Sequence, residues 1–301
     1  MANDRATFRA TLIGAGAILL WASLAVFTAF TGPVPPLQLT ALTFTIAFAL
    51  ALCTWLARGE NPLRHLRLPL AAWALGIFGL FGYHALYFIA LKLAPPVEAS
   101  LINYLWPLLI VVFSALLPGQ NQDGRLRWFH IAGVALGLLG TLVLFVGRGV
   151  QFDPAHLPGF AAAFACAFTW SSYSVLSRRL PDVATDSIGG FCGAAALLAW
   201  IGHGLFETTL WPTESLHWLA IVALGLGPAG GAFFLWDIGM KRGDIRALGS
   251  MAYAAPLLST LLLILFGKGE FSLRIALACA LIVGGAILGA NDLWRRHPRR
   301  Q

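Results

Sequence analysis

The chain matches itself at an offset of 149 residues, and this internal repeat limits the architectures that it can adopt. The register holds from Trp21 to Gly140 without an insertion. Chance produces matches among Leu, Ala and Gly in such a sequence, but it rarely pairs Trp, Lys, Tyr and Pro. The matched pairs are Trp21/Trp170, Ser23/Ser172, Gly76/Gly225, Gly82/Gly231, Lys92/Lys241, Tyr104/Tyr253, Pro107/Pro256, Arg125/Arg274 and Gly140/Gly289. The sequence therefore predicts two copies of one unit, residues 1–150 and 151–301, within one integrated domain.

The composition indicates a lipid environment. Hydrophobic residues make up 58% of the chain and charged residues 11%, whereas a soluble domain carries about 25% charged residues. Ten apolar runs reach the roughly 20 residues that a helix needs to cross a bilayer. Backbone groups in lipid must pair within the protein, which favours helices for runs of this length. We therefore predict an all-α integral membrane protein with ten transmembrane helices at residues 11–30, 37–57, 70–91, 97–117, 128–146, 157–176, 187–206, 216–240, 247–266 and 273–293.

The basic residues predict the orientation of these helices. With the N-terminus in the cytoplasm, only Lys92, Arg148, Lys268 and Arg274 of the 20 Lys and Arg residues lie outside. Cytoplasmic loops of membrane proteins carry such an excess of basic residues. Both termini are therefore predicted to be cytoplasmic. The net charge of +7 is attributed to this topology and to contact with anionic lipid, not to nucleic-acid binding.

Each unit holds five helices, and this odd number inverts the second unit relative to the first in the membrane. Lys92 accordingly falls in an outer loop and its partner Lys241 in an inner one. Inverted repeats give a protein two similar packings that open to opposite sides, with a site near the midplane between the halves. This arrangement predicts transport by alternating access.

Aromatic residues are the first candidates for that site. Trp is expected at membrane interfaces, and Trp236 fits such a position, but Trp21, Trp106 and Trp170 fall near helix centres. The Tyr residues all lie within predicted helices, at Tyr83, Tyr87, Tyr104, Tyr173 and Tyr253. A buried Tyr hydroxyl or Trp N–H needs a partner, so these residues favour a polar or water-filled centre. Alternatively, they are core aromatics bonded to the backbone or to Ser.

Two predicted helices carry polar groups beside these rings. Tyr83, His84 and Tyr87 lie on neighbouring faces of 70–91, because residues three and four apart are neighbours on a helix. The same rule places Asn103 and Trp106 on one face of 97–117.

Pro107 and its partner Pro256 predict an interruption in the helices at 97–117 and 247–266. Proline has no N–H group, so the carbonyls of Asn103 and Ala252 lose their helical partners. Interrupted helices mark the binding region of many transporters. The alternative is a simple kink that a neighbouring Ser or Thr relieves.

Glycines four residues apart predict one close helix contact. Gly133 and Gly137 have this spacing in 128–146, and Gly285 and Gly289 have it in 273–293. A homodimer interface and packing within one chain both satisfy the pattern. Because the repeat already supplies two mating faces, packing within one chain and a monomer are favoured.

Several other kinds of chemistry are not indicated. No Asp or Glu is predicted at mid-depth, where a proton or sodium site would need one. His84 permits a proton role there, although it also fits as a packing residue. Lys92 and Lys241 are assigned to the dipoles at helix ends. The four Cys residues stand on separate helices without metal-ligand spacing, and no nucleotide-binding or hydrolase motif occurs. We therefore expect no metal, no cofactor and no enzymatic activity.

The whole pattern resembles the EamA-type members of the drug/metabolite transporter superfamily. The most specific points are Trp-x-Ser in the first helix of each half and the prolines of the fourth and ninth helices. The resemblance implies a central cavity lined by the first, third, fourth, sixth, eighth and ninth helices, with the fifth and tenth behind. The segment from Gly82 to Pro107, with Tyr-His-Ala-Leu-Tyr at 83–87 and Asn-Tyr-Leu-Trp-Pro at 103–107, is most similar to the bacterial aromatic amino acid exporters.

The resulting hypothesis is export of aromatic and other neutral amino acids across the bacterial cytoplasmic (inner) membrane, by facilitated diffusion or proton exchange. The rings would hold the substrate side chain, and Asn103, Tyr83, His84 and the freed carbonyls would meet its amino and carboxylate groups. The candidate binding residues are Tyr83, His84, Tyr87, Asn103, Tyr104, Trp106, Trp170 and Tyr253, with Pro107 and Pro256 at the helix breaks. The alternatives are a broad-specificity drug or metabolite exporter of the same superfamily and, from another class, a passive membrane channel.

Overall fold

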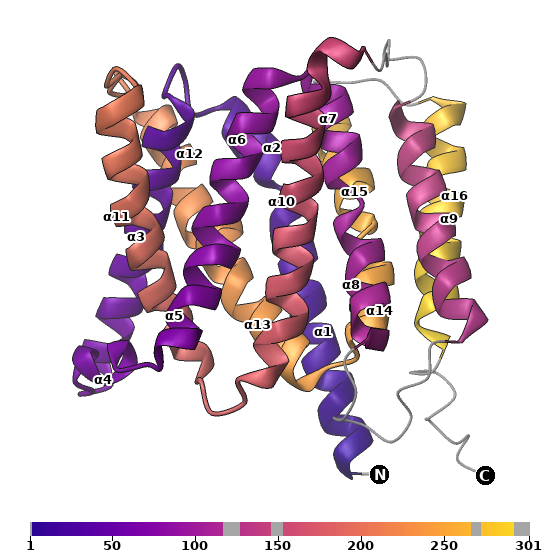
Figure 1. Ribbon diagram of the computed structural model, residues 1–301, viewed down its shortest axis with the longest axis horizontal. Coiled ribbons are helices and arrows are strands. Elements are labelled where there is room, and N and C mark those ends of the chain that lie inside the picture. Colours follow the sequence, from indigo (N-terminus) through magenta and orange to yellow (C-terminus); the bar gives the residue numbers. More distant parts are fainter. Residues whose placement is uncertain (1, 117–126, 146–152, 266–271, 292–301) are drawn as a thin grey trace.

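The computed structural model describes residues 2–116, 127–145, 153–265 and 272–291, and these ranges contain helices and no strand. Long helices run side by side, and their connections lie at the two ends of the bundle (Figure 1). The α-helices are α1 (Ala2–Ala22), α2 (Leu24–Ala29), α3 (Pro36–Ala57), α4 (Pro62–Leu66), α5 (Leu70–Ile77), α6 (Tyr83–Leu93), α7 (Pro96–Asn103), α8 (Trp106–Leu116), α9 (Trp128–Phe145), α10 (Leu157–Leu176), α11 (Ile188–Phe206), α12 (Ser215–Leu226), α13 (Ala232–Arg242), α14 (Ile245–Met251), α15 (Ala254–Leu265) and α16 (Leu273–Gly289). Shorter turns are η1 (Phe78–Gly82), η2 (Pro154–His156), η3 (Ser177–Arg179), η4 (Thr185–Ser187) and η5 (Gly227–Gly231).

Nine helical segments of the described chain are long and apolar enough to cross a membrane. Seven of them combine consecutive elements: α1 with α2, α5 with η1 and α6, α7 with α8, η2 with α10 and η3, η4 with α11, α12 with η5 and α13, and α14 with α15. The tenth predicted segment is helical over the 17 residues of α16, which is shorter than the others. The predicted boundary between residues 150 and 151, and the predicted helix ends at 117, 146, 266 and 293, lie outside the described residues.

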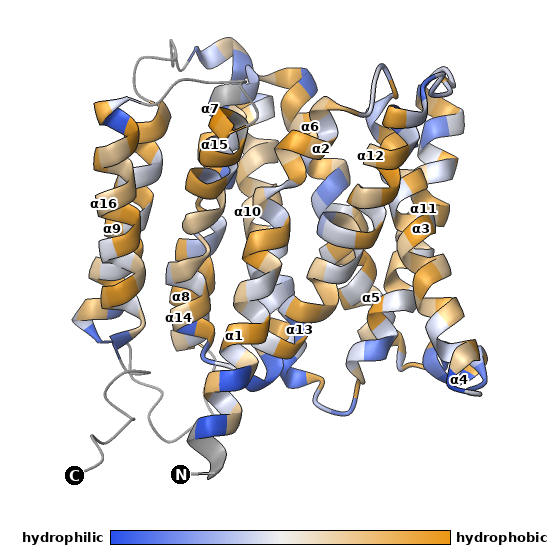
Figure 2. Cartoon of the chain, turned by 180° about the vertical axis from the view of Figure 1, so that it is seen from behind, coloured by the Kyte–Doolittle hydropathy of each residue, from blue (hydrophilic) through white to orange (hydrophobic). Residues whose placement is uncertain are grey.

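Hydrophobic residues cover the lengths of the helices and hydrophilic residues gather near their ends (Figure 2). This distribution is the one that a bilayer requires of a protein that crosses it. We call the end that carries the start of α1 and α4 the lower end, as it stands in Figure 1.

Two long helices contain a π-turn at equivalent positions of the two halves. The turn η1 occupies Phe78–Gly82 between α5 and α6, and η5 occupies Gly227–Gly231 between α12 and α13. The second turn thus lies 149 residues after the first, which is the offset of the sequence repeat. Such turns are rare and occur frequently at functional sites.

Two further helices are interrupted just before a proline. The chain leaves the helical path at Tyr104–Leu105 between α7 and α8, and at Ala252–Tyr253 between α14 and α15. The expectation of a free carbonyl at Ala252 was wrong, because this oxygen accepts a hydrogen bond from the N–H of Ala255 at 3.1 Å. The local tightening to i→i+3 spacing supplies the donor that Pro256 cannot.

Equivalent helices of the two halves pack against each other. Helix α9 lies along α16, and α3 lies along α11. A Cβ atom added to Gly133 would lie 2.7 Å from the Gly285 carbonyl oxygen and from the Gly289 Cα. The glycines therefore bring the backbones of α9 and α16 into contact within one chain. The sequence analysis favoured this packing over a homodimer interface.

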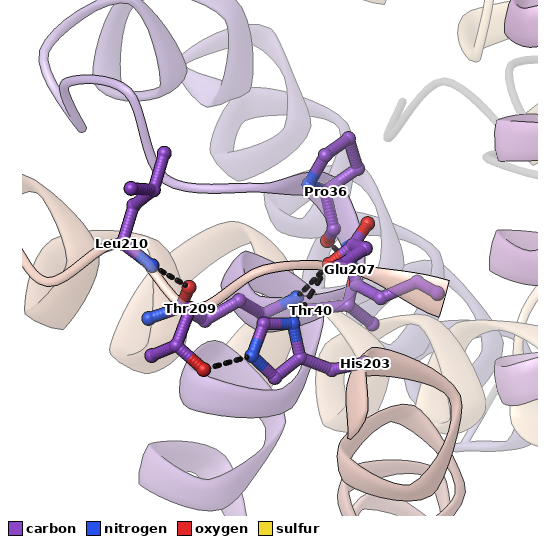
Figure 3. A network of polar contacts seen from close by, with 8 residues as sticks. Pro36, Thr40, His203, Glu207, Thr209 and Leu210 are labelled. Carbon is purple, nitrogen blue, oxygen red and sulfur yellow. Dashed lines mark hydrogen bonds and ion pairs between the residues drawn. The ribbon is translucent and has the colours of Figure 1, made fainter. Parts of the chain in front are cut away.

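A buried polar network joins the upper ends of α3 and α11 (Figure 3). The carboxylate of Glu207, which ends α11, accepts hydrogen bonds from the first-turn N–H groups of Leu37 (2.9 Å) and Gln38 (3.0 Å) of α3. His203 lies between this carboxylate and Thr209, 2.9 Å from each. The network satisfies helix-end donors that have no partner within α3.

The lower ends of α3 and α11 are joined by the repeat equivalents of the residues that join their upper ends. Arg58, which ends α3, donates to Asp186, which lies just before α11, at 2.9 Å. His65 stacks on Trp55 and lies 2.6 Å from Glu60. Glu60, His65 and Asp186 bring their ligand atoms within 4.8 Å of one another. Because Asp186 already pairs with Arg58 and Glu60 with His65, we interpret this cluster as an ionic link between the two helices.

Replacing Glu207 with glutamine is expected to lower the thermal midpoint of the protein by roughly 5 °C, because about 2 kcal/mol of charge-assisted hydrogen bonding is lost. The measurement is thermal unfolding in detergent, followed by size-exclusion chromatography. Glu214→Gln is the matched control, since its side chain is 67% exposed against 8% for Glu207. Equal midpoints for the two variants would contradict the structural role of the network.

Candidate functional site

Four tryptophans from four helices form a ring cluster inside the bundle. Trp21 of α1 lies 5.1 Å from Trp236 of α13, 5.6 Å from Trp170 of α10 and 6.2 Å from Trp106 of α8, between ring centroids. Phe233 of α13 contacts Trp170 at 5.7 Å. We call these five residues the ring cluster. Trp106, Trp170 and Trp236 are at most 6% exposed, so in this state the rings are packed where the sequence analysis expected a water-filled centre.

Hydrogen bonds fix the positions of these rings. The Trp21 indole N–H donates to the carbonyl of Pro228 in η5 at 3.1 Å, and the Trp236 indole N–H donates to the Ser174 hydroxyl at 3.0 Å. Ser171 donates to the carbonyl of Trp106 at 3.0 Å, next to the helix break. Each of these contacts links different transmembrane segments, so a movement of one segment disturbs the others.

Polar side chains border the ring cluster on α6 and α7. Asn103 donates to the Tyr83 hydroxyl at 3.0 Å, and the Tyr83 ring lies 5.6 Å from Trp170. The Nδ1–H of His84 donates to the Leu80 carbonyl at 2.7 Å. Tyr87 stacks parallel to Tyr83 at 6.2 Å. The structure therefore brings Tyr83, His84, Tyr87, Asn103, Trp106 and Trp170 together, as six of the eight candidate binding residues.

The Asn103 side chain has an unused hydrogen-bonding group. Its carbonyl oxygen Oδ1 is buried and has no partner among the described residues. A buried polar atom without a partner costs about 1–3 kcal/mol. A ligand with an ammonium or hydroxyl group beside Tyr83 would relieve this cost.

Of the two remaining candidates, Tyr253 faces the other way, whereas Tyr104 lies near enough to Tyr83 and Tyr87 to interact with both electrostatically. Tyr253 is fully buried among Val134, Leu257 and Ile282, and its ring packs on Gly137 of α9. Tyr104 lies 6.3 Å from Phe145, also on α9. The Tyr253 side chain therefore belongs to the contact with α9, and Tyr104 lies between α9 and the tyrosines that border the ring cluster.

Sequence reasoning missed two members of the cluster, Phe233 and Trp236. Trp236 is 1% exposed and not interfacial, which corrects the position that its place near the helix end favoured. A signal was present in the repeat, since Phe233 and Trp236 lie 149 residues after His84 and Tyr87. His84 and Phe233 contact each other at 6.3 Å, as the repeat mates Trp21 and Trp170 do at 5.6 Å.

Comparison with known proteins identifies the family of this helical bundle. The sequence profile described as "EamA-like transporter family" matches residues 8–146 and again residues 157–289. The chain belongs to the EamA-like transporter family.

Proteins similar to this chain carry transport descriptions. The chain is 58% identical to the "Aromatic amino acid exporter YddG" of Ancylobacter novellus over 289 residues, which cover 95% of this chain and 98% of that protein. It is 23% identical to the protein of the same description from Escherichia coli, covering 93% and 96% of the two chains. A solved crystal structure with 55% sequence identity superposes with a TM-score of 0.89, covering 96% of this chain and 99% of that one.

Proposed function

We propose that this EamA-like protein exports aromatic and other neutral amino acids across the bacterial cytoplasmic membrane by alternating access. The observation that carries the proposal is the ring cluster between the halves, bordered by Tyr83, His84 and the unpaired Asn103 oxygen. The description of the 58% identical relative as an aromatic amino acid exporter supports the same substrate class. Relatives described as threonine/homoserine exporters, 25% identical, support the extension to other neutral amino acids.

The proposed topology has ten transmembrane helices in two inverted five-helix halves, with both termini and the lower end in the cytoplasm. In this scheme α16 is the tenth membrane helix. Three observations support it: the family profile matches twice, the π-turns recur at the repeat offset, and the start of α1 and the end of α16 lie at the same end of the bundle.

In the proposed site, Trp106, Trp170 and Trp236 hold the aromatic side chain of the substrate. Asn103, Tyr83 and His84 meet its polar head group, and Tyr87 extends the aromatic wall. The rings pack against each other without substrate, so transport requires the cluster to part. Tyr253 acts in this scheme by packing its interrupted helix against α9, and Tyr104 extends the row of tyrosines from Tyr83 and Tyr87 toward α9.

The experiment that tests the function is efflux of radiolabelled phenylalanine from vesicles that contain the purified protein. A carrier is expected to saturate and to release label faster when unlabelled phenylalanine is present on the opposite side. A passive channel would do neither, and vesicles without accelerated release would refute amino acid export. A competition panel of amino acids and unrelated drugs separates the amino acid exporter from a broad-specificity exporter.

The same vesicles test energy coupling. Facilitated release is expected to continue without a pH gradient, because the buried carboxylate next to Trp236, Asp237, is already paired with Lys241 at 3.0 Å. Proton-driven release that His84→Ala abolishes would instead assign the coupling to His84.

A further inference from the structure

A small cleft opens at the lower end of the bundle, directly below the ring cluster. The cleft is narrow and partly open to solvent, so an amino acid enters it only when the side chains of its walls part. Its walls come from α5, α10, α11 and α13, with Gly76, Tyr173 and Phe191 among the lining residues. Tyr173 is shared with the site above, since its ring lies 5.3 Å from Trp170. The cleft is therefore one side chain away from the proposed binding site.

One ion pair forms the charged part of this otherwise largely apolar cleft. The Lys241 ammonium lies 3.0 Å from one carboxylate oxygen of Asp237, and Thr185 donates to the other oxygen at 2.7 Å. Lys241 also donates to the carbonyl of Val183 at 2.8 Å. The Asp237 side chain is 2% exposed and that of Lys241 12%. The pair thus fastens α13 to the segment between α10 and α11, and it goes beyond the helix-dipole role expected for Lys241.

The repeat-equivalent positions of the first half lack this arrangement. The repeat equivalent of Lys241 is Lys92, which is exposed at the end of α6. The equivalent of Asp237 is Phe88, so no carboxylate stands at the corresponding position. At this pair of equivalent positions, the lower mouth therefore differs from the upper one.

A buried ion pair can be opened without a large penalty only if each charge receives a new partner. The head group of an amino acid carries one carboxylate and one ammonium group, which match Lys241 and Asp237 respectively. Charge-assisted hydrogen bonds to these groups would replace those that the pair makes with itself. The rings of Tyr173 and Phe191 would receive an apolar side chain.

We infer that the Asp237–Lys241 cleft is an entry site at which a zwitterionic amino acid docks from the cytoplasm before it reaches the ring cluster. This inference rests on the proposed function. Docking exchanges the internal ion pair for two pairs with the substrate, and this exchange releases α13 from the segment at Val183–Thr185. Recognition of the head group at this mouth gives substrate that arrives from the inside a position in which to dock.

The test is uptake of radiolabelled phenylalanine into everted membrane vesicles, whose outer face is the cytoplasmic one. Lys241→Met and Asp237→Asn are each expected to raise the KM at this face about tenfold. The matched control is Lys92→Met, which removes the repeat equivalent and should leave the KM within about twofold. In right-side-out vesicles, the two variants are expected to show no comparable rise in the KM. If both neutral variants kept the KM of the unaltered protein, the entry site would be ruled out.

Analogues with half a head group separate docking from a purely structural pair. Phenethylamine should lose inhibitory strength in Asp237→Asn, and 3-phenylpropionate should lose it in Lys241→Met. Equal losses for both compounds in both variants would indicate structural damage and overturn the inference. If the neutral variants fail to reach the membrane, Lys241→Arg keeps the charge but moves the donor, and an unchanged KM there counts against docking. Failure of the proposed function differs from all these results, because the unaltered protein would then take up no phenylalanine.

Discussion

Replacing Trp170 with alanine is expected to reduce phenylalanine efflux at least tenfold, roughly 1.4 kcal/mol of lost binding or transition-state stabilisation. Trp170 contacts rings on both sides of the cluster, including Trp21, Tyr83 and Phe233. Its removal therefore opens a gap in the wall that would hold the substrate side chain. The measurement is initial efflux from vesicles with equal amounts of each protein.

Trp128→Ala provides the matched control for this prediction. It is the same substitution on a side chain that is 74% exposed at the start of α9. Efflux should remain within about twofold of the unaltered protein in the control. Unchanged efflux in both Trp170→Ala and Trp106→Ala would refute the aromatic binding site, since both rings are placed against the substrate.

Introducing valine at Gly285 is expected to prevent stable folding or to lower the thermal midpoint by roughly 10 °C. A Cβ atom at Gly285 would lie 2.5 Å from the Gly133 carbonyl oxygen and 2.9 Å from the Gly137 nitrogen, both in the backbone of α9. Backbone atoms cannot move aside as a side chain can, so overpacking here costs about 3 kcal/mol or more. Thermal unfolding in detergent and the yield in the membrane fraction measure the effect.

The neighbouring glycine supplies an unusually close control. Gly284 directly precedes Gly285 on α16, but a Cβ atom added to Gly284 would meet nothing within 4 Å. Gly284→Val should therefore keep the yield and the thermal midpoint. Similar damage in both variants would mean that helix propensity, and not the contact between α9 and α16, decides the outcome.

The membrane character and the repeat could be predicted from the sequence because both depend on local composition and on spacing. Apolar runs of about 20 residues have few alternatives to a helix in lipid. The neighbourhood of Tyr83, His84 and Asn103 was also accessible, since helical spacing selects the face of each helix. The direction in which a side chain at a helix break points was not predictable from helical spacing, which is why Tyr253 was placed with the wrong neighbours.

Other features depend on contacts that no local pattern contains. Ser23 and Ser172 stand in the same Trp-x-Ser motif, yet the chain breaks at Ser23 and continues as helix through Ser172. Tertiary packing, and not the motif, therefore decides where the helix stops. Each π-turn likewise adds one residue to a helical turn, and the neighbouring helices must leave room for it. The glycines nearby make such a turn possible, but their presence in the sequence does not predict it.

The links between α3 and α11 have a consequence for biogenesis. The helix-end donors of Leu37 and Gln38 are satisfied by Glu207, and Arg58 finds its acidic partner at Asp186. All these partners are synthesised more than a hundred residues later than the groups they satisfy. The nascent first half consequently enters the bilayer with polar ends exposed, and it waits in an unfinished state until the ribosome has delivered the later helices.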